Sequence, residues 1–184
     1  MIQFKINYQF ETLLSLIKKE AHGRELAKEL KTSLTRIQSI LTELTNNNVV
    51  DFKIEGKNHM YFIKKNLVSR SYVLNAENYK LAKLLRKHVF LEPILKEIII
   101  NYPGKMVILF GSYAKFIPKE DSDIDIYIDT SDKSIKGKIA SIYSKLSVKT
   151  GEFDKEDLLV SEIIKNHIII QGGEEFYEKL RFFA

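Results

Sequence analysis

The chain contains no cysteine, so neither disulfide bonds nor thiolate metal ligands contribute to it. Its histidines are scattered and form no cluster that would predict a zinc site. No apolar run approaches the length of a membrane span, and the first residues lack the basic and apolar segments of a signal peptide. We therefore expect a cytoplasmic protein without a membrane partner.

Linkers rich in glycine, serine or proline are also missing, as are internal repeats. The 184 residues suffice for one domain or two small ones. Residues 1–105 hold 18 Lys and Arg against 10 Asp and Glu, whereas residues 106–184 hold 11 against 14. A basic half followed by an acidic half suggests a nucleic-acid contact in the first and a cation-requiring site in the second.

The most informative segment of the second half is GSYAKFIPKEDSDID, residues 111–125. It follows the apolar run 106–110, which predicts a buried strand that ends in a glycine turn. Gly111 has no Cβ to keep a phosphate chain at a distance, and Ser112 is expected to open a short helix whose free N–H groups attract anions.

The strict alternation of polar and apolar residues from Asp123 to Asp129 predicts a second strand with one wet face. Asp123 and Asp125 then project from the same side, about 7 Å apart along the strand, where two carboxylates can share a Mg²⁺ ion. The plainer alternative is an ordinary turn followed by the solvated face of an amphipathic strand.

The combined pattern G-S-x10-D-x-D resembles the signature of the minimal nucleotidyltransferases, within the polymerase-beta-like nucleotidyltransferase superfamily, over residues 106–184. The resemblance implies that Gly111, Ser112 and Lys115 hold the phosphates of an NTP and that Asp123 and Asp125 bind catalytic Mg²⁺. It also implies transfer of a nucleoside monophosphate to an acceptor hydroxyl, with release of pyrophosphate.

Two positions depart from this family. Many members carry a small residue, commonly glycine, where this chain has Phe116. The superfamily also uses a third carboxylate on a later strand, often as a base. We expect a helix over residues 133–147 and that strand over residues 148–154, with Glu152 as the first candidate for the catalytic base and Asp154 as the second. The alternative for both acids is a surface loop.

In the first half, the apolar spacing predicts helices over residues 10–21, 24–30 and 34–46, followed by a β-hairpin with strands 49–54 and 59–64. This order is similar to a winged helix-turn-helix domain, in which the third helix enters the major groove of DNA. The alternatives are a merely solvated helix face or a protein-interaction module. The resemblance predicts DNA contacts for Ser33, Thr35, Arg36, Gln38, Ser39, Lys53 and Lys57.

The predicted fold class is α+β. It comprises a winged helix-turn-helix domain over residues 1–66, a connector over 67–104 with helices 75–87 and 91–100, and a palm-like α/β nucleotidyltransferase domain with a small mixed sheet over 105–184. We expect Mg²⁺-dependent nucleotidyl transfer from an NTP to an unknown acceptor, with a partner protein such as a toxin as one candidate. The DNA-binding domain would be regulatory.

Two rival functions stay open at this point. In the first, the protein is a DNA-binding regulator whose second domain only senses nucleotide. In the second, both domains form an interaction scaffold. A homodimer is the default expectation for a winged helix protein that binds paired half-sites on double-stranded DNA.

Overall fold

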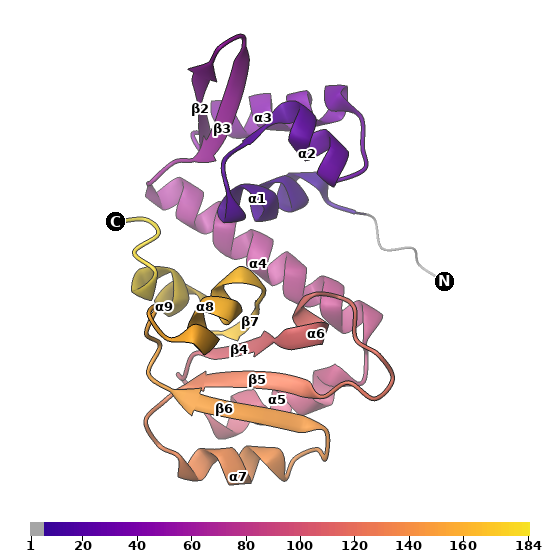
Figure 1. The fold of residues 1–184 in the computed structure, drawn as a ribbon, viewed down its shortest axis with the longest axis vertical. Coiled ribbons are helices and arrows are strands. Elements are labelled where there is room, and N and C mark those ends of the chain that lie inside the picture. The colour runs from indigo at the N-terminus through magenta and orange to yellow at the C-terminus, as the bar shows by residue number, and fades with distance from the viewer. Residues whose placement is uncertain (1–5) are drawn as a thin grey trace. The chain divides into compact units, whose positions relative to one another are not determined.

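The computed structural model describes residues 6–184, whose helices and strands follow the order labelled in Figure 1. The chain divides into two compact units, one ending at Tyr79 and including Phe182–Ala184, the other spanning Lys80–Arg181. The division falls inside the helix α4 (Leu67–Lys87). Among residues 6–184, no helix has both the length and the apolar character needed to cross a bilayer.

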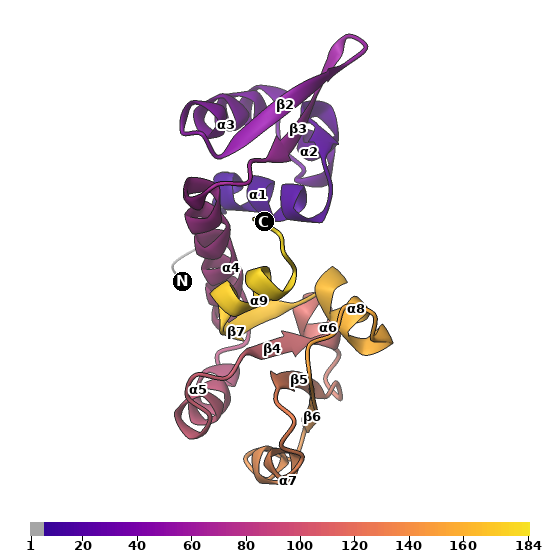
Figure 2. The ribbon, with the colours of Figure 1, turned by 90° about the vertical axis from the view of Figure 1, so that its left-hand side faces the viewer.

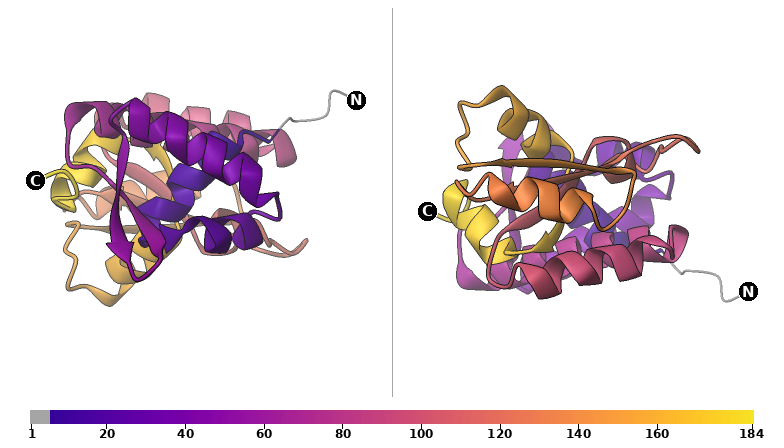
Figure 3. Two further views of the ribbon diagram at one scale, coloured as in Figure 1. Left: turned by 90° about the horizontal axis from the view of Figure 1, so that it is seen from above. Right: turned by 90° about the horizontal axis from the view of Figure 1, so that it is seen from below.

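In its described residues, the first unit contains three complete helices, the first part of α4 and a three-stranded antiparallel sheet with strand order β1-β3-β2 (Figures 2 and 3). The three helices and the hairpin predicted from the sequence are present, whereas the two-residue strand β1 was not predicted. In chain order the elements are α1 (Tyr8–Lys18), β1 (Ala21–His22), α2 (Gly23–Glu29), α3 (Leu34–Asn46), β2 (Val50–Glu55) and β3 (Asn58–Ile63).

Side-chain caps fix where two of these helices begin. The Asn7 side chain accepts the N–H groups of Gln9 and Phe10 at 3.1 and 3.2 Å and so starts α1. Ser33 accepts the N–H of Arg36 at 3.3 Å and starts α3 in the same way. The apolar faces of these helices meet in a core that includes the fully buried Leu13, Leu26, Ile37, Leu41 and Leu44.

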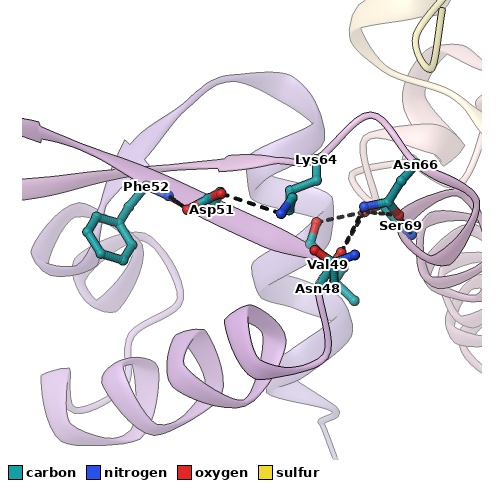
Figure 4. A network of polar contacts seen from close by, with 7 residues as sticks. All are labelled: Asn48, Val49, Asp51, Phe52, Lys64, Asn66 and Ser69. Atoms are coloured by element: carbon teal, nitrogen blue, oxygen red, sulfur yellow. Dashed lines mark hydrogen bonds and ion pairs between the residues drawn. The ribbon is translucent and has the colours of Figure 1, made fainter.

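Helix α4 begins at Leu67, eight residues before the predicted start at Asn75. The reason is a cap that the sequence analysis overlooked, because the Asn66 side chain accepts the N–H of Ser69 at 2.8 Å. Ser69 in turn donates its hydroxyl to the carbonyl oxygen of Val49 at 2.8 Å, which ties the helix start to the start of the hairpin (Figure 4).

The second unit is built on a four-stranded mixed sheet with strand order β6-β5-β4-β7. Strand β4 is antiparallel to β5 and to β7, whereas β6 is parallel to β5. The small mixed sheet expected for this half is therefore present. Its strands are β4 (Val107–Phe110), β5 (Ile124–Asp129), β6 (Leu146–Gly151) and β7 (Ile168–Gln171).

One face of this sheet packs against α5 and α7, and the other, here called the polar face, carries Asp125 and Asp129 beside the buried Ile108 and Tyr127. Ile124, Ile126 and Ile128 of β5 belong to a core cluster together with residues of α5 and α7. Helix α8 lies on the opposite face from α5 (Figure 2). The helices of this unit, beyond the end of α4, are α5 (Leu91–Asn101), α6 (Gly111–Ala114), α7 (Ser134–Ala140), α8 (Leu158–Lys165) and α9 (Gly173–Lys179).

The prediction for residues 133–154 was wrong in its boundaries. The helix α7 ends at Ala140 and the strand β6 already begins at Leu146, so it ends at Gly151, before Glu152. Leu146 and Val148 are buried against the core, which leaves the alternate residues on the polar face. Extending the helical pattern through Leu146 in the sequence concealed this short alternation.

Candidate functional site

The two aspartates of the motif lie at the start of β5 on the polar face of the sheet. Ile124 and Ile126 point into the core, so the alternate positions face the other way. Asp123 is exposed and directly precedes the strand, whereas Asp125 is half-buried within it. The structure therefore places both carboxylates on one side of the sheet.

Gly111 approaches Asp125 directly. The residue before it, Phe110, pairs with Asp125 across the β4–β5 ladder, and Gly111 itself has a φ of +70° at the start of α6. A β-carbon built at Gly111 would overlap the Oδ2 atom of Asp125. Two independent constraints thus require glycine here, namely the left-handed backbone and the space that the carboxylate occupies. Ser112 follows in α6 and is half-buried.

The charges around Asp125 act in opposite directions on its pKa. Burial raises the pKa above its ordinary value, and the neighbouring Asp123 adds to this effect. A hydrogen bond from Ser147 and the positive charge of Lys149 lower it. Both of these opposing residues lie on β6, where Ser147 is the register partner of Asp125.

Lys115, the third residue implied to hold phosphate, lies exposed at the end of α6. The pKa of Glu162 on α8 is lowered mainly by its ion pair with Lys165 at 2.7 Å, and the positive charge of Lys115 adds a smaller effect. The next residue, Phe116, has a φ of +60°, so the chain adopts at this position the backbone that glycine favours. Phe116 therefore has the backbone conformation typical of glycine although its side chain is larger than that of many family members.

The structure does not bring Glu152 to the aspartate pair. Gly151, the last residue of β6, pairs with Asp129 at the far end of β5, and Glu152 comes after it. Its charge acts there on Tyr127 and Lys179, whose pKa values both rise in part because of it. Asp154, the second candidate, is exposed and accepts the N–H of Glu156 at 3.0 Å.

Asp129, a further acid on the polar face of β5, is engaged elsewhere. Its Oδ2 lies 2.8 Å from the Lys179 ammonium, and its Oδ1 accepts the N–H of Phe153 at 3.0 Å. Its side chain is only 9% exposed, which marks it as part of the packing under α9. Within residues 6–184, no group of three or more acidic or histidine side chains is placed to hold a metal ion.

The donor set of Asp123 and Asp125 fits a magnesium ion. Mg²⁺ takes oxygen ligands, keeps several waters, and in phosphate-transfer sites is held by one or two carboxylates together with substrate phosphates. A half-buried and an exposed carboxylate provide two such oxygen ligands, and the exposure of Asp123 leaves that carboxylate accessible to solvent. The chemistry that such an ion supplies is neutralisation of phosphate charge.

The predicted DNA-contact residues of the first unit fall into two groups. Ser33 caps α3, Arg36 lies 4.9 Å from the ring centroid of Tyr8, and Lys53 pairs with Glu20 at 2.6 Å. These side chains have intramolecular partners. The remaining predicted contacts are exposed, three on α3 and one at the hairpin turn: Thr35, Gln38, Ser39 and Lys57.

Comparisons with known proteins agree with this geometry. Residues 94–181 match the family model described as Polymerase beta, Nucleotidyltransferase. Two relatives from Methanocaldococcus jannaschii, both named "Putative protein adenylyltransferase", are 36% and 37% identical over 96 and 92 residues. These alignments cover 52% and 50% of this chain and 90% and 86% of the relatives.

A crystal structure described as a toxin-antitoxin with AMP-PNP is 23% identical, with a TM-score of 0.34, over 58% of this chain and 86% of that one. The site and the family match define the second unit as a nucleotidyltransferase. The chain belongs to the polymerase beta nucleotidyltransferase family, and among its relatives are the two archaeal proteins named as adenylyltransferases.

Proposed function

We propose that this protein transfers AMP from ATP to a hydroxyl group of another protein, with Mg²⁺ held by Asp123 and Asp125. The observation that carries the proposal is the close approach of Gly111 to the Asp125 carboxylate. The names of the two archaeal relatives support ATP as the donor and a protein as the acceptor. A toxin partner, one candidate that the family resemblance suggests, is one class of such an acceptor.

The roles follow from the placement of the residues. The backbone at Gly111 and Ser112 binds the terminal phosphates, because N–H groups in the first turn of a helix have no partner within the helix. The acceptor oxygen forms a bond to the α-phosphorus while the bond from that phosphorus to the bridging oxygen breaks. Pyrophosphate leaves with the bonding electron pair, and the hydroxyl proton passes to water, because Glu152 lies at the other end of the strand.

The test is label transfer. The purified protein is incubated with Mg²⁺, an extract of its own cells and ATP labelled on the α-phosphate, and labelled protein is detected after denaturing electrophoresis. We expect a labelled protein band that is absent with ATP labelled on the γ-phosphate. The double variant Asp123→Asn and Asp125→Asn should abolish the band.

A matched control is available two residues before the pair. Asp121 is exposed, and the variant Asp121→Asn removes one negative charge from the same loop without touching the polar sheet face. This variant should label the acceptor as the wild type does. Tight ATP binding without any labelled macromolecule in the complete extract would instead support a nucleotide sensor and contradict transfer.

We propose in addition that the first unit is a winged helix-turn-helix that binds double-stranded DNA. Its support is the element order α1-β1-α2-α3-β2-β3 with an antiparallel sheet, and the exposed polar residues of α3. Lys57 at the hairpin turn is exposed and has no ion pair within residues 6–184, whereas Lys53 is paired with Glu20 and Glu55 at 2.6 and 3.7 Å.

Duplex binding is tested by fluorescence anisotropy with genomic fragments over a range of salt concentrations. Loss of Lys57 should lower the slope of log affinity against log salt by about 1, and loss of Gln38 should weaken binding without changing that slope. Lys18→Ala, on the exposed side of α1, is the control. Absence of duplex binding at low salt would contradict this proposal.

A further inference from the structure

A lysine stands beside the aspartate pair on the neighbouring strand. Strand β6 runs parallel to β5, with Ser147 opposite Asp125 and Lys149 opposite Tyr127. Register partners in a sheet project to the same face, so Lys149 shares the polar face with Asp125. The positive charge of Lys149 acts on Asp125, which agrees with this placement.

This lysine is free to bind a ligand. Lys149 is exposed, and within residues 6–184 its ammonium group forms no ion pair or hydrogen bond. Two other lysines of this unit are already engaged, since Lys179 pairs with Asp129 at 2.8 Å and Lys165 pairs with Glu162 at 2.7 Å. An ammonium group that shares a sheet face with Asp125 without closing an ion pair remains available for a phosphate group.

The order of the strands indicates which phosphate of the nucleotide lies near Lys149. Across the polar face the chain presents Gly111 at the end of β4, then Asp125 on β5, then Lys149 on β6. If the terminal phosphates lie at Gly111, as the proposed function holds, the nucleoside monophosphate end of the substrate points toward β6. We infer that Lys149 binds the α-phosphate of the substrate nucleotide.

The inference rests on the proposed function and names a substrate-contacting residue that the motif G-S-x10-D-x-D does not contain. At this exposed position we expect a charged hydrogen bond from the lysine to phosphate to change the affinity by about tenfold. Lysine acts here as a point charge, so arginine should substitute for it in part.

The experiment measures equilibrium affinity and not turnover. Affinities for ATP and for pyrophosphate are determined by calorimetry in the presence of Mg²⁺ for the wild type, Lys149→Met, Lys149→Arg and the control Lys136→Met. Lys136 is exposed on α7, which packs against the other face of the sheet, and its loss changes the net charge equally. Circular dichroism confirms that each variant is folded.

The expected result is that Lys149→Met weakens ATP binding about tenfold while pyrophosphate binding stays within about twofold of the wild type. Lys149→Arg should retain most of the ATP affinity, and Lys136→Met all of it. Equal losses for ATP and pyrophosphate would place Lys149 at the phosphate tail and overturn the assignment.

Failure of the inference and failure of the proposed function give different results. ATP binding that is lost in Asp125→Asn but unchanged in Lys149→Met overturns the role of Lys149 and leaves the site intact. A wild-type protein that binds neither ATP nor pyrophosphate in the presence of Mg²⁺ overturns both.

Discussion

Gly111 leaves the space that the Asp125 carboxylate occupies. Gly111 directly follows Phe110, which pairs with Asp125 across the β4–β5 ladder, and a β-carbon at position 111 would overlap the carboxylate oxygen Oδ2. The Gly-Ser part and the Asp-x-Asp part of the motif are therefore structurally coupled. Its glycine sets the position of its second aspartate, so a change at one end of the motif is expected to displace the other.

The variant Gly111→Ala should accordingly lose ATP affinity as well as stability. Forcing alanine into a backbone with a φ of +70° costs about 1–2 kcal/mol, and the collision additionally displaces Asp125. Gly104→Ala is the matched control, because Gly104 has a φ of +73° and no atom lies within 4 Å of the place that an added β-carbon would take. Both variants should lose similar stability in chemical unfolding, and only Gly111→Ala should lose ATP affinity, by more than about tenfold.

Asp125→Asn should separate stability from function. Burial raises the pKa of Asp125 above its ordinary value of 3.8, so the folded state disfavours the ionised form, and its stability falls relative to the unfolded chain as pH rises from about that value. The asparagine variant lacks this loss. Without Mg²⁺ at neutral pH, its melting temperature should exceed that of the wild type.

Adding Mg²⁺ and ATP should reverse the order, because ligands that bind only the folded state stabilise it. The wild type should then gain in melting temperature and Asp125→Asn should not. Scanning calorimetry at pH 4 and pH 7 checks both statements. A variant less stable than the wild type at pH 7 without Mg²⁺ would contradict the assigned effect of burial.

Periodicity predicted the parts of the fold whose pattern is long and regular. The alternation over Asp123–Asp129 gave β5 to within one residue, because every second side chain enters the core. Helix α4 began earlier than predicted because its start depends on the Asn66 cap, a single side chain and not a repeating pattern. Short strands such as β6 have too few alternations to outweigh a neighbouring helical pattern.

For the candidate site, residues adjacent in sequence were predictable and cross-strand neighbours were not. Gly111, Asp123 and Asp125 occur within one motif, and their mutual placement follows from a strand, a turn and a strand. The residues beside them on β6 depend on a parallel register that no local pattern encodes. The signal that could have identified Lys149 was the alternation Leu146, Ser147, Val148, Lys149, with apolar residues at every second position.

Replacement of Glu152 tests whether this residue is the catalytic base, as the family resemblance implied, or lies away from the site, as the register of β5 and β6 indicates. Glu152 follows the end of β6, beside Asp129 at the far end of β5 from the pair. Glu152→Gln should therefore leave label transfer and ATP affinity within about twofold of the wild type, a change of less than about 0.5 kcal/mol. Loss of labelling by more than about a hundredfold with unchanged ATP affinity would restore Glu152 as the catalytic base.

At position 116 a glycine variant should be more stable than an alanine variant, which is the reverse of the order found inside helices. The φ of +60° of Phe116 disfavours any residue with a β-carbon, and its ring packs against the core cluster while its carbonyl oxygen accepts a hydrogen bond from Lys87 at 3.0 Å. Phe116→Ala and Phe116→Gly lose the same packing, but only glycine is free of the backbone strain. The glycine variant should be more stable than the alanine variant by about 1 kcal/mol in urea unfolding.

The variants Lys136→Ala and Lys136→Gly are the matched control, and here the alanine variant should be the more stable one. Lys136 lies exposed inside the helix α7, where glycine is less stable than alanine by about 1 kcal/mol. Comparing the two positions cancels effects common to every alanine-to-glycine change, including the greater freedom of glycine in the unfolded chain. If alanine proved more stable than glycine at both positions, the left-handed backbone at Phe116 would be contradicted, and with it the explanation for the small residue that the family carries there.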